Sequence, residues 1–89
     1  MKAILTVIGT DKVGIVAGVT QKLAELEINI LDISQTIMGT SFTMIMLCDL
    51  SASKRELVEV KEALNQKGQA LDVKISIQRE EIFDAMHRI

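Results

Sequence analysis

Residues 9–33 decide the fold of this chain, and they read GTDKVGIVAGVTQKLAELEINILDI. The apolar run 3–8 leads into this stretch and predicts a strand, a polar turn with Asp11 and Gly14 opens a helix, and a β-rich run follows. A helix N-terminus carries unpaired N–H groups and a partial positive charge, which suit a carboxylate or phosphate. Because Gly14 has no Cβ, a ligand can approach the backbone there. The turn therefore predicts a binding site rather than a reaction.

The helix in this stretch has a single apolar stripe. Asp11 is expected to be its N-cap, with the carboxylate accepting from the N–H of Val13 or Gly14. Four apolar residues follow at helical spacing and predict the buried face: Val16, Val19, Leu23 and Leu26. Gly14 and Gly18 lower the helix propensity, which close approach of a strand or a ligand would explain.

Three further strands are predicted, at 28–38, 42–48 and 71–78. The runs 3–8 and 42–48 are apolar on both faces, which is typical of central strands covered on both sides. The other two strands each carry one polar face and are expected at the edges of the sheet. Gly39-Thr40 fits a two-residue type II′ turn between the second and third strands.

The second helix is expected to begin with a capping box formed by Ser53 and Glu56 and to end near Gly68 as its C′ residue. A short third helix is expected over 79–89, with acidic residues early and basic residues late. The order is β-α-β-β-α-β plus a C-terminal helix. Right-handed crossovers then place both main helices on one face of a four-stranded antiparallel sheet. The fold class is α+β, a ferredoxin-like sandwich with one additional helix.

Composition limits the function of this chain of 89 residues. A domain of this size is marginally stable alone, so we expect a homo-oligomer, most simply a dimer. The net charge of −2 and the lack of a Lys/Arg cluster argue against nucleic acid as a partner. No apolar run is long enough to cross a membrane, and the single Cys48 suits a reduced, cytoplasmic setting.

The motif from Asp11 to Val16, together with residues 23–33, resembles the sequence pattern of the ACT domain family. The resemblance covers 1–78, an ACT-like domain, and leaves 79–89 as a C-terminal helical extension of the same domain. It implies a small stand-alone regulatory protein, not an enzyme, that binds an amino acid or a similar ligand at a subunit interface. Binding would modulate assembly or a protein partner.

The resemblance also implies the ligand-binding residues, from two subunits. They are Asp11, Gly14, Ile15 and Val16 on one side, and Asn29 and Ile30 on the side of the second subunit. A ligand carboxylate could meet N–H groups at Gly14 to Val16, while its ammonium meets Asp11 or the Asn29 side-chain oxygen. Two residues depart from the family pattern. Glu27 stands where Gly is common, and Asp11 stands where Asn often appears in members with a known amino-acid ligand.

Other interpretations of these residues stay open. Asp11 can serve only as a cap, Asn29 can simply begin a strand, and Gly14 and Gly18 can be packing glycines. The alternative function is a ligand-free interaction module that acts through the sheet or the C-terminal helix.

Catalysis has no support in the sequence. Asp11 and Asp32 come with no nucleophile, and an acylphosphatase-type enzyme would need an Arg in its first loop, where only Lys12 stands. Cys48 and His87 lack the spacing of a metal site, so we expect no metal and no cofactor. Met38, Met44 and Met46 are expected in the core or a subunit interface.

Overall fold

The computed structural model describes the backbone of residues 1–86 and the side chains of residues 1–84. Its elements are β1 (Lys2–Thr10), α1 (Ile15–Glu25), β2 (Asn29–Met38), β3 (Ser41–Asp49), α2 (Leu57–Leu71), β4 (Val73–Arg79) and α3 (Glu80–Met86). The strands form one antiparallel sheet in the order β2-β3-β1-β4. The ferredoxin-like βαββαβ fold with an added helix is confirmed, as are the central strands β1 and β3 and the edge strands β2 and β4.

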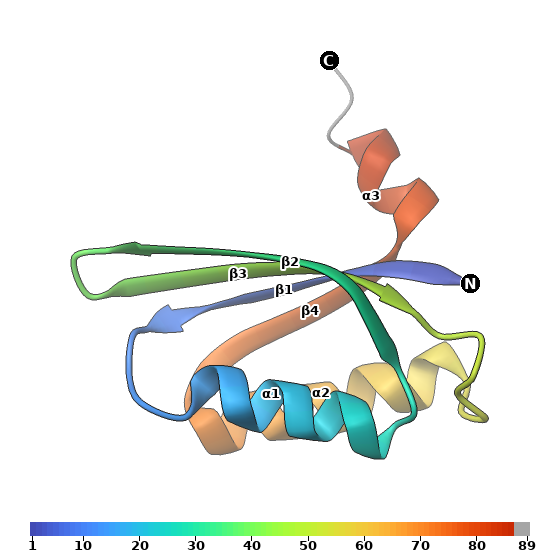
Figure 1. Ribbon diagram of the computed structural model, residues 1–89, viewed down its shortest axis with the longest axis horizontal. Coiled ribbons are helices and arrows are strands. Elements are labelled where there is room, and N and C mark those ends of the chain that lie inside the picture. Colours follow the sequence, from blue (N-terminus) through green and yellow to red (C-terminus); the bar gives the residue numbers. More distant parts are fainter. Residues whose placement is uncertain (87–89) are drawn as a thin grey trace.

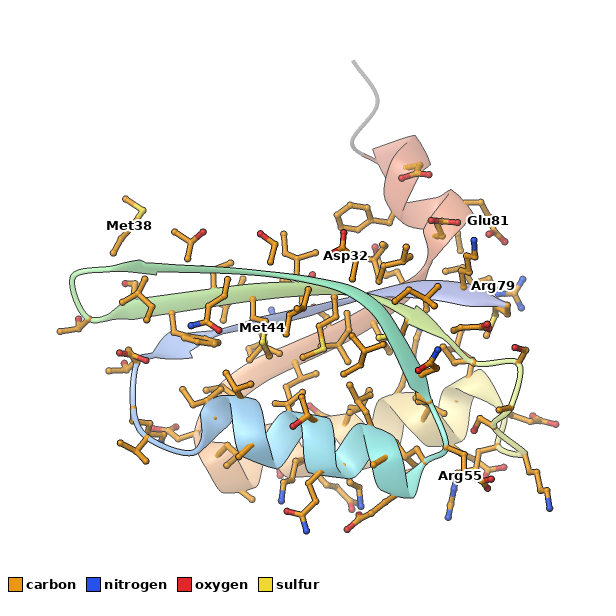
Figure 2. All side chains as sticks on the ribbon, viewed as in Figure 1. Asp32, Met38, Met44, Arg55, Arg79 and Glu81 are labelled. Carbon is orange, nitrogen blue, oxygen red and sulfur yellow. The ribbon has the colours of Figure 1, made fainter. Side chains whose placement is uncertain are left out.

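The molecule has two layers, with α1 and α2 on one face of the sheet and α3 rising from the other (Figure 1). The core lies between the sheet and the two long helices, where Leu5, Met44 and Leu23 are fully buried. Figure 2 shows Met44 on the helix side of the sheet, and Asp32 and Met38 on the opposite side. An aliphatic core between one helical layer and one sheet face is the packing that the apolar stripes predict.

The outer face of the central strands is less covered than the sequence predicts. Ile8 of β1 is 52% exposed and Ile45 of β3 is 40% exposed, because both long helices pack on the opposite face. Within the part of the chain that the structure describes, only α3 lies over this side, near the end of β4 (Figure 1). The expectation of cover on both faces is therefore wrong for the single chain.

Both predicted N-caps are wrong. The N-cap residue of α1 is Gly14, and no side chain caps the helix. The Asp11 N–H donates instead to the Thr40 carbonyl oxygen at 2.7 Å, and the chain turns between Asp11 and Gly14 before the helix begins. The helix α2 starts after Glu56, again without a side-chain cap. The Ser53 hydroxyl instead accepts from the Arg55 N–H at 3.4 Å, so the predicted capping box does not form.

The end of α2 also lies further along the chain than predicted. Gly68 is inside the helix, which continues to Leu71 and ends at Asp72 with a left-handed φ of 58°. A Cβ on Gly68 would lie 2.8 Å from the Val73 carbonyl oxygen, so this glycine permits close contact between helix and strand. The fourth strand consequently begins at Val73 rather than Leu71.

The turn between β2 and β3 has the predicted length. Met38 faces Ser41 in the strand register, which leaves the two-residue loop Gly39-Thr40 with a φ of 63° at Gly39. The predicted third helix begins at Glu80 because Arg79 still belongs to β4. Its last predicted residues, 87–89 with His87, lie outside the described residues. No described helix is long and apolar enough to span a membrane.

Candidate functional site

The start of α1 is an open backbone site. Gly14 has a φ of 96°, and a Cβ built there would meet nothing within 4 Å. The Gly18 N–H is the first to bond back to the Gly14 oxygen, at 2.9 Å, so the N–H groups of Ile15, Val16 and Ala17 have no acceptor within the helix. A positive backbone end with open space beside it suits an anionic group.

Asp11 lies in the same loop and is exposed, and its backbone N–H is held by the hairpin tip through the hydrogen bond to the Thr40 carbonyl oxygen. The Asp11 carboxylate makes no cap, so it is available to a cation. The neighbouring Lys12 reaches the Asp72 carboxylate only at 3.9 Å, with both side chains largely exposed, which contributes little stability. The loop therefore presents one carboxylate beside the open N–H groups.

Asn29 and Ile30 lie at the other end of α1. The helix has 11 residues, so its ends are separated by about 16 Å. The structure thus brings together Asp11 and residues 14–16, and it does not bring Asn29 or Ile30 to them within one chain. Asn29 is exposed at the start of β2, directly after the turn in which Glu27 has a φ of 60°.

Two residues near these groups were missed by the sequence reasoning. Asp49 faces Asn29 in the strand register, and its Oδ1 accepts from the Ser51 hydroxyl at 2.7 Å and the Ser51 N–H at 3.0 Å. The pKa of Asp49 is lowered, first by the hydrogen bond from the Ser51 hydroxyl and second by the hydrogen bond from the Ser51 N–H. The Asp-x-Ser pattern of a local turn is a signal that could have identified Asp49. Thr40 carries no such local signal.

Other chemistry is weakly represented. Cys48 is fully buried, and burial raises the pKa of its thiol to about 11, so the thiol is neutral and unreactive at physiological pH. Among the described residues no group of three or more His, Cys, Asp or Glu could hold a metal ion.

A groove with a volume of about 510 Å³ lies elsewhere, between α2 and β4. It is lined by Lys61, Glu62, Leu64, Asn65, Ile75, Ser76, Ile77 and Gln78. None of the residues predicted to bind a ligand borders it, and it lies on the opposite edge of the sheet from β2. We assign the candidate site to α1 and not to this groove, because the loop before α1 combines free N–H groups with a carboxylate.

The chain resembles known proteins over its whole length. The family profile described as ACT domain matches residues 2–78. A UPF0237 protein of Listeria innocua is 64% identical over 89 residues, covering 100% of both chains. The structure of an ACT domain protein from Streptococcus pneumoniae superposes with a TM-score of 0.83 at 49% identity, and the match covers 98% of each chain. The regulatory subunit of aspartate kinase from Thermus thermophilus superposes with a TM-score of 0.68 at 26% identity, covering 86% of this chain and 50% of that one.

These comparisons and the βαββαβ sandwich define a ferredoxin-like domain of the regulatory class. Members of this class commonly bind small molecules and assemble into oligomers. The chain belongs to the ACT domain family and, within it, to the UPF0237 proteins.

Proposed function

We propose that this chain is a regulatory ACT domain that binds an amino acid or a similar small zwitterion between two copies of itself. One observation carries the proposal. The open N–H groups and Asp11 lie at one end of α1, and Asn29 lies about 16 Å away at the other end. A small ligand can contact both groups only when a second copy supplies one of them.

The edge strand β2 is suited to hold that second copy. All of its residues from Leu31 to Met38 are exposed, and Ile33 and Ile37 are 44% and 48% exposed on the helix side of the sheet. Long exposed apolar edges are templates for pairing with another strand. In an antiparallel pair of two β2 strands, a two-fold axis at Gln35 sets Ile33 of each copy opposite Ile37 of the other. Facing residues of such a pair point to the same side of the sheet, so these four isoleucines form one apolar cluster.

This register supports the two-sided site. It pairs Asp32 with Met38 of the second copy, so that the residues before Asp32 run beside the partner turn Gly39-Thr40. That turn holds the Asp11 loop through the Thr40 oxygen. At its start β2 bends toward the helix layer, the layer that also contains the beginning of α1 (Figure 1). Asn29 of one copy would then approach Gly14 of the other.

The chemistry of the assembled site matches a zwitterion. A ligand carboxylate would accept from the N–H groups of Ile15 and Val16 at the helix start. The ligand ammonium would donate to the Asp11 carboxylate and to the side-chain oxygen of Asn29 from the second copy. Recognition of both charges selects amino acids over simple anions or amines. The regulatory subunit of aspartate kinase among the structural neighbours favours such a role.

A thermal-shift screen against the twenty amino acids tests ligand binding. A hundredfold excess of ligand over Kd should stabilise the protein by about 2.7 kcal/mol. Asp11→Ala and Asn29→Ala should abolish the shift, whereas Asn65→Ala, at an exposed asparagine on α2, should preserve it. Preserved binding in both site variants would refute the assigned site. No shift with any amino acid would favour the ligand-free interaction module, for which α3 offers Ile82 at 48% exposure.

The oligomeric state tests the role of β2. Ile33→Asp should lower the molecular mass of the assembly in solution and also abolish the thermal shift, because the substitution puts two carboxylates into the paired strands. Ile45→Asp is the matched control, since Ile45 is 40% exposed on the other face of the sheet. An Ile33→Asp protein with unchanged mass would exclude pairing through β2.

A further inference from the structure

The sheet has a second free edge, at β4. Within the described residues this strand pairs only with β1, so the backbone groups on its outer side have no strand partner. The groove of about 510 Å³ runs along this edge, with Leu64, Ile75 and Ile77 as its buried floor and α2 as its wall. An unpaired strand beside an apolar floor is a place where another strand can add.

The sequence of β4 complements itself about its own centre. An antiparallel pairing of two copies with the two-fold axis at Ser76 aligns all 7 residues of the strand. It sets Ile75 opposite Ile77, Lys74 opposite Gln78 and Val73 opposite Arg79, each pair twice. Every facing pair points to the same side of the sheet, and no cation faces a cation. A shift by one residue would set buried positions against exposed ones.

The same two-fold axis brings charged residues beside β4 of one copy close to charged residues of the other. Lys61 and Glu62 are adjacent on the wall of the groove, so two antiparallel copies of α2 can set each lysine against a glutamate of the other copy. At each end of the strand the register sets Asp72 of one copy opposite Glu80 of the other, and Arg79 of that other copy lies directly beside this acidic pair, where it can bind Asp72. Asp72 can accept this partner because its side chain is 94% exposed and its contact with Lys12 is long, at 3.9 Å.

We propose that the β4 edge and its groove form a second interface between copies of this chain, in which β4 pairs with β4 across a two-fold axis at Ser76. This interface is independent of ligand binding and of the pairing proposed for β2. The edge is accessible, because α3 contacts β1 as well as β4 and rises over the sheet face instead of along its edge (Figure 1). A chain with two such edges can join neighbours on both sides.

Disulfide trapping tests the register directly. In Ser76→Cys the two thiols face each other with Cα atoms about 5 Å apart, inside the range of a disulfide. In Lys74→Cys, on the same exposed face, the two thiols are offset by four residues, about 14 Å. Oxidised glutathione should therefore convert Ser76→Cys to a covalent dimer, with Lys74→Cys trapped about tenfold less. Cys48 does not compete, because it is fully buried.

The trapping is also measured in the Ile33→Asp background, which removes the proposed β2 pairing. Trapping there supports the β4 interface whatever happens to ligand binding, so the two proposals fail separately. Lys61→Glu should reduce the trapping because it makes the groove wall uniformly acidic, and the swap Lys61→Glu with Glu62→Lys should restore it. Lys54→Glu, on the exposed loop before α2, is the control with the same change in net charge. Equal trapping of Ser76→Cys and Lys74→Cys, or none of either, would overturn the proposal.

Discussion

Replacing Glu27 by glycine should stabilise this protein. Glu27 sits in the turn after α1 with a φ of 60°, a conformation that costs an L-residue about 1–2 kcal/mol and glycine nothing. Part of that gain is lost because glycine has more conformational freedom in the unfolded chain, which costs about 0.4–1 kcal/mol. The Glu27 side chain is exposed, so its removal takes no packing from the core. The net expectation is a stabilisation of about 1 kcal/mol.

Thermal and urea unfolding of Glu27→Gly measure this effect, and the expected rise in Tm is about 4–8 °C for a domain of this size. Glu25→Gly is the control, because Glu25 is still helical and pairs with Lys22 at 3.4 Å, so glycine there should lower the stability. If Glu27→Gly is as destabilising as Glu25→Gly, the strain assigned to this turn is wrong.

Further predictions concern glycine packing and the buried thiol. Gly68→Ala should lower the free energy of unfolding by about 1 kcal/mol, because its Cβ would press on the Val73 carbonyl oxygen. Gly18→Ala should be near neutral, since its Cβ would meet the movable side-chain ends of Leu71 and Lys67 rather than backbone. Burial raises the pKa of the Cys48 thiol from 9.0 to about 11 in the folded state. Below pH 9 the thiol is neutral in both states and the full stability is present. Between pH 9 and 11 the thiol ionises in the unfolded chain but not in the folded one, so stability is lost as the pH rises. Urea unfolding should record a loss of roughly 3 kcal/mol over that range, and Cys48→Ala should remove this pH dependence.

The periodic parts of the sequence predicted the fold well. The run 42–48, apolar on both faces, identified a central strand whose Met44 and Met46 are fully buried, and the polar face of 71–78 identified an edge. Helical spacing likewise identified Val19 and Leu23 as core residues. Such patterns predict helices and strands reliably because many residues of one element contribute to the same apolar periodicity, so a single exception does not change the predicted element.

The helix ends could not be predicted, because they depend on contacts distant in sequence. Asp11 looks like an N-cap, but the Thr40 oxygen takes its N–H and delays the helix until Ile15. Gly68 looks like a helix end, but it stays helical where the chain needs close contact with Val73. For the candidate site, the sequence predicted the loop at Asp11 and Gly14, and the contribution of Asn29 from a second copy remains a prediction.

The hydrogen bond between Asp11 and Thr40 couples two parts of the fold that are distant in sequence. It joins the loop before α1 to the tip of the β2–β3 hairpin, at a distance of 2.7 Å. An event that fixes the loop therefore also fixes the hairpin, and the reverse holds with equal strength, since the coupling free energy between two binding events is reciprocal. If the proposed ligand binds at this loop, its concentration would be converted into a change in the position of the hairpin and, through β2, in the association of the copies, with no covalent bond made or broken.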